Sequence, residues 1–411
     1  MLLQFTVSNF LSFRDPVTFD MRPGNIQKEG ALWDQHVYED REGGKTLTLP
    51  LGIIYGANAG GKSNFASALY FMWCRIFLGM QDPAIQIREA ALEPIPFLLD
   101  AEMRSRPSLF SVRFKQDGCI YDYGFTILEK QIQEEWLYTE QNGEETKVFH
   151  RFVEGEESTF DGTTAPEQLL ELGTYAPSSI LLLSMYQKLL PLSVVYEWFR
   201  RLCILSPNTH YSELDKRVFQ DPEFAEFLSR ALHEVDTGIC KVAAHKKENA
   251  APSSEESLST SANQNVQYRL FTFHDTTAKL PLPIGLESSG TRRLMHLLPG
   301  LYELERGQLH TLVIDELDNS LHPLLSQWFI RKFLAIPKTS RSQLIFTTHD
   351  STLLSMDDIR KDEVWFMEKD GKGVSQLSRL SEFNTKPDLN YASGYLSGRF
   401  GGIPVIHSEK E

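Results

Sequence analysis

The sequence has few basic residues for its length and few cysteines. It holds 41 Lys plus Arg against 55 Asp plus Glu in 411 residues, which gives a formal net charge of −14 at pH 7. This balance excludes a globally basic nucleic-acid-binding protein. The four cysteines lie far apart and form no Cys-x-x-Cys pair. Neither a disulfide framework nor a zinc site is indicated, so we expect a cytoplasmic protein.

Long apolar segments are also missing. The most apolar stretch, residues 66–80, contains Arg75 and is shorter than the roughly 20 residues that cross a bilayer. The opening LLQFTVSNF alternates polar with apolar residues, unlike a signal peptide. We therefore expect no membrane as a partner. The composition, 41% hydrophobic and 23% charged, is that of a globular protein with one large domain or two to three units.

The first 160 residues predict mainly β-structure. Strand patterns occupy residues 3–7, 17–19, 47–55, 109–128 and 135–153, and Asp117-Gly118 divides the fourth into a hairpin. Residues 64–80 have helical periodicity. A strand, a glycine-rich loop and a helix therefore follow one another between residues 47 and 80.

The middle of the chain predicts helices, and its end predicts alternating strands and helices. Helical patterns cover 166–172, 181–199 with a break near Pro191, and 222–235, whereas 244–265 is polar and serine-rich. After a strand from residue 266, helices 290–306 and 321–333 alternate with strands 309–314, 343–347 and 363–368. This alternation is typical of a parallel sheet covered by helices.

We divide the chain accordingly into four parts. Residues 1–160 form the first part of an α/β domain with an antiparallel β lobe, and 161–243 form a helical insertion. Residues 244–265 form a linker or loop, and 266–411 form the second part of the domain.

A phosphate-binding motif lies between the strand and the helix of the first part. Residues 56–63, GANAGGKS, fit the pattern GxxxxGK[ST] in the strand-to-helix context that it requires. Backbone N–H groups would surround the phosphates of ATP, Lys62 would reach the β- and γ-phosphates, and Ser63 would bind Mg²⁺. The candidate nucleotide-binding residues here are Gly56, Asn58, Gly60, Gly61, Lys62, Ser63 and Asn64.

Two acidic residues and a histidine follow later strands. The run LHTLVIDE ends in Asp315 and Glu316, which suit Mg²⁺ binding and the polarisation of an attacking water. His349 follows the strand QLIFTT and could contact the γ-phosphate. Alone, the two acids would fit a solvated turn equally well and the histidine would fit a structural role better. Together with the glycine-rich motif they indicate a site in which Lys62, Glu316 and His349 are catalytic and Ser63 and Asp315 bind the metal.

A second small-residue segment precedes a predicted helix. Ser288, Ser289 and Gly290 at a helix start could form another anion site. An ordinary serine N-cap is the alternative reading.

The order of these motifs resembles the ABC-type ATPases of the SMC, RecF and OLD group. In that family's pattern, GANAGGKS looks like Walker A, ESSGT like the signature, VIDE like Walker B, LDNSLHP like the D-loop and THD like the switch histidine. The resemblance implies a P-loop NTPase of ABC-ATPase type whose site is shared between two chains. Ser288 and Gly290 would then come from a partner chain, Asp318 would lie at the seam, and the protein would be a homodimer or higher homo-oligomer.

Within that group the sequence is most similar to short members of the RloA, AbiLii and PARIS AriA type. The resemblance rests on FTVSNFLSFRD near the start and YLSGRFGGIPVI near the end. It implies an anti-phage role with a separate effector protein, a nuclease or toxin. Leu11 stands where many repair members carry arginine, and no unmistakable Q-loop glutamine is present, although Gln187 is a candidate.

Two other functions stay open at this point. One is a RecF-like DNA repair ATPase, which would contact DNA through residues 198–201 (WFRR) or 245–247 (HKK). The other is a non-catalytic scaffold that ATP assembles.

Overall fold

The computed structural model describes residues 1–24, 30–77, 93–154, 157–207, 213–246, 267–275, 280–384 and 390–404. The linker predicted at 244–265 lies outside these residues except for 244–246, which end a strand. Within the described ranges, no helix combines the length and the apolar character that crossing a membrane requires.

A six-stranded sheet forms the centre of the molecule. Its strands run in the order β11 (Leu202–Leu205), β15 (Thr311–Ile314), β16 (Gln343–Thr348), β5 (Leu51–Gly56), β17 (Val364–Lys369) and β18 (Ser375–Arg379). All neighbours are parallel except β17 and β18. The three middle strands β15, β16 and β5 are buried throughout, which explains their unbroken apolar sequences. The predicted parallel sheet is confirmed.

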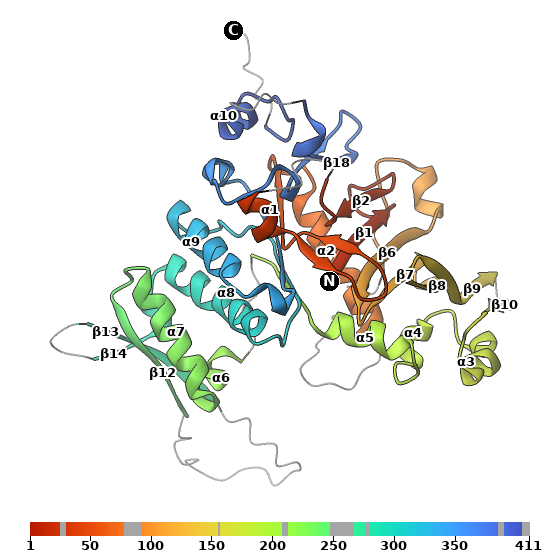
Figure 1. Ribbon diagram of the computed structural model, residues 1–411, viewed down its shortest axis with the longest axis horizontal. Helices are drawn as coiled ribbons and strands as arrows, with labels where there is room; N and C mark the ends of the chain where they lie inside the picture. The colour runs from red at the N-terminus through yellow and green to blue at the C-terminus, as the bar shows by residue number, and fades with distance from the viewer. Residues whose placement is uncertain are drawn as a thin grey trace, which may run out of the picture.

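Helices and a second sheet cover the two faces of this central sheet. On one face, Ile53 and Phe346 pack in a core with α8 (Ser289–Glu305) and α9 (Pro323–Leu334). On the other face, Ile54 packs in a core with α2 (Lys62–Phe77) and the second sheet. Figure 1 shows α8 and α9 on one side of the molecule and the second sheet on the other.

The second sheet is antiparallel and has seven strands. Their order is β10 (Glu157–Asp161), β9 (Glu144–Glu154), β8 (Gln131–Gln141), β7 (Cys119–Leu128), β6 (Ser108–Gln116), β1 (Leu2–Ser8) and β2 (Val17–Asp20). Asp117 (φ 49°) and Gly118 (φ 73°) form the two-residue turn between β6 and β7, as the sequence predicts, because both adopt positive φ. This sheet is the predicted antiparallel β lobe.

Gln343 connects the two sheets. It is the first residue of β16 and is fully buried. Its side chain accepts a hydrogen bond from Leu2 N (2.5 Å) and donates to Leu2 O and Leu49 O (3.0 Å each). One amide thus ties strand β1 of the β lobe to the central sheet.

The segment from 161 to 243 is not helical throughout. It contains α3 (Glu167–Leu172), α4 (Leu182–Met185), α5 (Leu192–Arg200), α6 (Leu214–Gln220) and α7 (Pro222–Glu234), with the expected break before Pro191. It also contains β11, an edge strand of the central sheet, and most of β12 (Ile239–Lys246). The expectation of helices alone is wrong at these strands. The division of the chain at 161 and 243 stays a prediction.

A small third sheet projects beside α6 and α7 (Figure 1). Its order is β12, β13 (Tyr268–His274) and β14 (Pro281–Pro283), all antiparallel. The remaining elements are α1 (Ala31–His36), β3 (Tyr38–Asp40), β4 (Thr46–Thr48), α10 (Tyr391–Leu396), and the 3₁₀ helices η2 (Glu102–Ser105), η3 (Gly173–Tyr175), η4 (Ile284–Leu286), η5 (Lys338–Ser340), η6 (Ser351–Ser355), η7 (Lys361–Glu363) and η8 (Leu380–Glu382).

Candidate functional site

The glycine-rich motif forms the turn between β5 and α2. Lys62 is the first residue of α2 and is only 5% exposed. Its Nζ donates to Gly56 O (2.7 Å) and Ala57 O (3.0 Å), so the ammonium is held against the loop by backbone carbonyls. Burial lowers the pKa of Lys62 from 10.5 to about 8, and the nearby carboxylates of Asp315 and Glu316 oppose this shift. A buried cation with only neutral direct partners suits an anionic ligand.

The loop is supported by residues that sequence reasoning missed. Gly61 has φ +114°, and a Cβ there would lie 2.3 Å from Ser375 Oγ, so only glycine fits. Ser375 Oγ donates to Gly60 O (2.8 Å) and also bonds to Ser12 Oγ (2.7 Å). Ser375, which bonds to Ser12 from the opposite end of the chain, therefore supports the backbone of the loop. Single serines carry no sequence signal for such a role.

The other predicted residues of the loop differ in exposure. Asn58 and Ser63 are exposed, and Ser63 lies in the first turn of α2, where its hydroxyl is accessible to a ligand. Gly60 is buried. The amide of Asn64 donates to Ser12 Oγ (2.6 Å). The amide thus supports the loop, and a contact of Asn64 with nucleotide stays a prediction.

Asp315 and Glu316 follow β15 directly, as expected. Asp315 is 4% exposed. Thr347 in the adjacent strand β16 donates from Oγ1 to Asp315 Oδ1 (2.7 Å) and accepts from Glu316 N (2.8 Å). Glu316 has φ +53°, and Asn319 donates to its Oε2 (3.2 Å). Thr347 thus orients both acidic residues, a role that the sequence does not indicate.

His349 lies beside Lys62, one residue beyond the end of β16. Its Nδ1 is 3.5 Å from Lys62 Nζ, and its backbone N–H donates to the carboxylate of Asp318 (3.2 Å to Oδ2). The pKa of His349 is lowered, first by partial removal from water and second by the charge of Lys62. A neutral imidazole with a free nitrogen is therefore placed next to the lysine. The structure brings these predicted residues together.

Three neighbouring strands create this convergence. In the order β15, β16 and β5, the three parallel strands end at the same edge of the sheet. Asp315 and Glu316 follow the first, His349 follows the second, and the glycine-rich loop follows the third. The carboxyl edge of a parallel sheet is where such folds bind ligands.

The serine-rich segment lies at the start of α8 and makes different contacts. Ser288 is the N-cap: its Oγ accepts from Thr291 N (3.1 Å). Ser288 and Ser289 are exposed. A Cβ on Gly290 would lie 2.7 Å from Ser320 O, so this glycine allows α8 to approach the segment after Asp318. In the described residues, no hydrogen bond joins these serines to the glycine-rich loop of the same chain.

Arg293 connects α8 to the acidic pair, and sequence reasoning missed it as well. It is 8% exposed, and its guanidinium donates to the backbone carbonyls of Asp315 and Glu316 (3.3 Å each) and of Ser206 (3.2 Å). Burial lowers its pKa. The start of α8 is thereby fixed relative to the end of β15.

Other sequence candidates lie outside this site. Trp198 and Phe199 are fully buried whereas Arg200 is exposed, so a phosphate contact of the stretch 198–201 would fall to its arginines, and it stays a prediction. Gln187 bonds to Ser184 O (3.5 Å) within the helical segment. Arg14 pairs with Asp15 (2.8 Å) at the surface.

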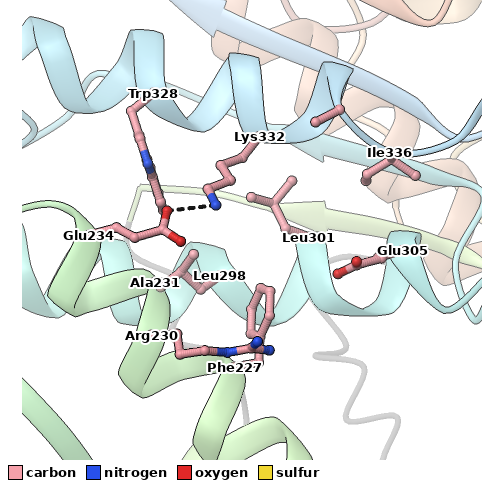
Figure 2. A pocket seen from close by; sticks show the side chains of 11 residues that line it. Phe227, Arg230, Ala231, Glu234, Leu298, Leu301, Glu305, Trp328, Lys332 and Ile336 are labelled. Carbon is pink, nitrogen blue, oxygen red and sulfur yellow. Dashed lines mark ion pairs between the residues drawn. The ribbon is translucent and has the colours of Figure 1, made fainter.

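A cavity of about 280 Å³ lies elsewhere, between α7, α8 and α9 (Figure 2). Figure 2 shows apolar side chains such as Phe227 and Leu298 inside it and the ion pair of Glu234 with Lys332 (2.6 Å) across it. No predicted site residue lines it. The cavity is a gap between helix faces, separate from the candidate site.

Residues 52–355 match a family model described as "AAA domain, putative AbiEii toxin, Type IV TA system". The match covers about three quarters of the chain and includes the glycine-rich loop, the start of α8, the acidic pair and His349. The chain belongs to this family. Its fold is the P-loop fold of ABC type that the sequence predicts.

Solved SMC heads have similar structures. The SMC head domain from Thermotoga maritima is 12% identical in sequence to this chain. The match covers 92% of this chain and 98% of the SMC chain, with a TM-score of 0.38. The Smc head domain with a coiled coil and joint from Pyrococcus yayanosii is 10% identical in sequence to this chain. That match covers 97% of this chain and 99% of the Smc chain, with a TM-score of 0.46. No curated protein matches the sequence.

Proposed function

We propose that this protein binds and hydrolyses ATP and acts as a nucleotide-driven oligomeric switch. The observation that carries the proposal is the meeting of Lys62, Asp315 with Glu316, and His349 at one edge of the sheet. A buried lysine and two carboxylates supply the charges that phosphoryl transfer requires, and the histidine supplies a hydrogen-bonding group.

The residues present fit Mg²⁺ as the metal. The described residues contain no group of three or more His, Cys, Asp and Glu that could hold a metal alone. Ser63 and Asp315 would instead supply two oxygen ligands, and phosphate and water would complete the shell, as Mg²⁺ prefers. Bound there, Mg²⁺ would neutralise charge on the phosphates. Thr347 keeps the Asp315 carboxylate in place for this role.

Glu316 is the proposed catalytic base. Its carboxylate is partly exposed and is oriented by Asn319 at one oxygen and by Thr347 at the backbone. It would polarise a water for in-line attack on the γ-phosphate while Lys62 stabilises the negative charge. His349, next to Lys62, would contact the γ-phosphate, and this contact would be lost when the γ-phosphate leaves.

A second copy of the chain would complete the site. Ser288 and Ser289 are exposed at the N-terminus of α8 and, in the described residues, make no hydrogen bond to the loop of their own chain. They would face the phosphates of the partner copy, with Gly290 allowing close approach and Asp318 at the seam. ATP would then join the heads and hydrolysis would separate them.

We further propose a role in anti-phage defence with a separate effector, a nuclease or toxin, in the cytoplasm. This rests on the sequence resemblance to short defence ATPases and on membership of a family whose description names a toxin. The ATPase would restrain or activate the effector according to its nucleotide state.

Light scattering with a parallel phosphate-release assay tests the switch. Glu316→Gln should assemble with ATP and Mg²⁺ but hydrolyse at least about a hundredfold more slowly, because base catalysis is worth that much or more. Lys62→Ala should neither assemble nor hydrolyse. Undiminished hydrolysis in Glu316→Gln would remove this residue from its role, and a mass that ATP does not change would contradict the switch.

A further inference from the structure

The small sheet β12-β13-β14 has one covered and one open face. Residues directly opposite in an antiparallel pair share a face, so the register assigns Val242 with Thr272 and Ala244 with Leu270 to one side. These four are buried, and Val242 and Leu270 share a core with residues of α6 and α7. The other side therefore faces away from the helices.

The open face is basic and aromatic. The register places Lys241 opposite Phe273, Ala243 opposite Phe271, and His245 opposite Arg269, and continues on β14 with Pro281 and Pro283. Lys241, His245 and Arg269 are exposed, and the two phenylalanines are partly exposed. We call these eight residues the open face. It bears no carboxylate, although the chain has a net charge of −14.

The basic residues of the open face have no acidic partner in the described part of the chain. Among the described residues no ion pair involves Lys241, His245 or Arg269, whereas Glu213 pairs with Lys216 and Glu287 with His274. Lys241 Nζ lies 5.7 Å from the Phe273 ring centre, and the His245 ring lies 5.5 Å from that of Phe271. The Lys241 ammonium thus lies over the Phe273 ring, and the His245 ring meets the Phe271 ring edge to face.

Acidic groups do occur at the side of the sheet. Beyond β14 the face meets a hollow of about 480 Å³, lined by Arg269, Phe271 and Pro283 and also by Glu213 and Asp215 of the α6 region. Glu213 forms an ion pair with Lys216 (3.0 Å), and Asp215 accepts from the backbone N–H of Lys216 (2.9 Å). The partner of Asp215 is a neutral backbone group, so acidic side chains line the α6 rim of the hollow, whereas the open face itself bears no carboxylate.

We propose that the open face binds single-stranded nucleic acid. Bases would stack on Phe271 and Phe273, which stand two residues apart on the central strand, and phosphates would bind Lys241, His245 and Arg269. Stacking on aromatic rings combined with a cationic track is how proteins bind unpaired strands with little sequence preference. A paired duplex shields its base faces and would lose the stacking contribution. The proposal does not depend on ATP hydrolysis.

Fluorescence anisotropy with labelled oligonucleotides tests the proposal on the nucleotide-free full chain. The probes are (dT)₂₀, (U)₂₀ and a 20-base-pair duplex, which separate DNA from RNA and single from double strands. We expect both single strands to bind more tightly than the duplex at about 50 mM salt, and to weaken strongly at about 200 mM. Duplex binding that equals or exceeds single-strand binding would contradict the role of the rings.

Paired variants locate the binding. The double variant Phe271→Leu/Phe273→Leu keeps apolar side chains but removes both rings. It should weaken the binding of the single strands by about fivefold or more per ring. Lys241→Glu with Arg269→Glu should weaken binding and reduce the salt slope by about 1.4, the value for two phosphate contacts on a single strand. Circular dichroism would verify that each variant remains folded.

Matched controls come from other sheets. Lys369→Glu changes an exposed strand lysine on β17, and Phe152→Leu changes an exposed strand phenylalanine on β9. Both should bind as the unaltered protein does. Equal losses in controls and face variants would overturn the proposal. The proposal would also be overturned if none of the three probes bound, and a protein would then be the ligand to test on the open face.

Discussion

Lys62 illustrates how a single buried charge makes a site depend on pH. Its pKa is about 8 in the folded protein and 10.5 in an exposed lysine. Below pH 8 the Lys62 amine is protonated in both the folded and the unfolded chain. Burial of this charge then lowers the free energy of unfolding. Between pH 8 and 10.5 the folded state releases the proton first, so this residue's contribution to stability rises with pH.

Nucleotide affinity should change in the opposite direction. Because the triphosphate requires the protonated amine, ATP binding should weaken above about pH 8, by up to tenfold per pH unit. Isothermal calorimetry at pH 7 to 9.5 in two buffers of different ionisation enthalpy would measure both the affinity and the proton uptake. Lys62→Arg keeps its charge over this range and should show little pH dependence. Unchanged affinity of the unaltered protein up to pH 9.5 would contradict this role of Lys62.

Thr347 should control the metal requirement without touching the metal. Thr347→Val preserves the shape but leaves Asp315 Oδ1 and Glu316 N without their hydrogen bonds to the hydroxyl. The Mg²⁺ concentration for half-maximal hydrolysis should rise about 10- to 100-fold, the usual cost of losing an orienting partner. Thr347→Ser keeps the hydroxyl and should stay close to the original value. Identical Mg²⁺ curves for the two variants would show that Thr347 does not position Asp315.

Among the elements, α8 is linked to the small sheet by one carboxylate. Glu287, just before the N-cap Ser288, accepts from Thr272 Oγ1 and from His274 Nε2 (2.8 Å), both on β13. β14 also continues through η4 directly into this segment. The position of the proposed partner-facing serines therefore depends on the sheet.

Glu287→Ala should separate nucleotide binding from turnover. Without the carboxylate, the start of α8 loses its two connections to β13, whereas the glycine-rich loop keeps all of its contacts. Fluorescent-ATP binding should change little, and phosphate release should fall severalfold. Glu305→Ala, an exposed acid at the other end of α8, serves as control. A parallel loss of ATP affinity would place Glu287 in the binding site instead.

The sequence predicts those elements whose signal is local. GANAGGKS, the strand before Asp315 and the hairpin at Asp117-Gly118 each carry their pattern within about ten residues. β11 was missed because its four residues, LCIL, follow a helix after a single residue and are too short to show a period. Ser375 and Thr347 were missed because their roles depend on partners distant in the sequence.

At the scale of the whole molecule, Gln343 should contribute to global stability. Gln343→Leu would leave the N–H and carbonyl of Leu2 and the carbonyl of Leu49 without this partner in a fully buried place. The free energy of unfolding should fall by roughly 2–5 kcal/mol, because each unsatisfied buried group costs about 1–3 kcal/mol. Urea unfolding would measure this. Gln376→Leu on the exposed side of β18 should change stability by less than about 0.5 kcal/mol.

The strand order also determines when the protein can first bind its ligand. β5, which is followed by the glycine-rich loop, lies between β16 and β17 in the central sheet, and these two strands begin at residues 343 and 364. A chain emerging from the ribosome therefore holds the GANAGGKS sequence long before the sheet that shapes it can form. Such distant pairing slows folding. Nucleotide cannot assist the steps of folding that precede the translation of β16 and β17, since its site depends on these strands.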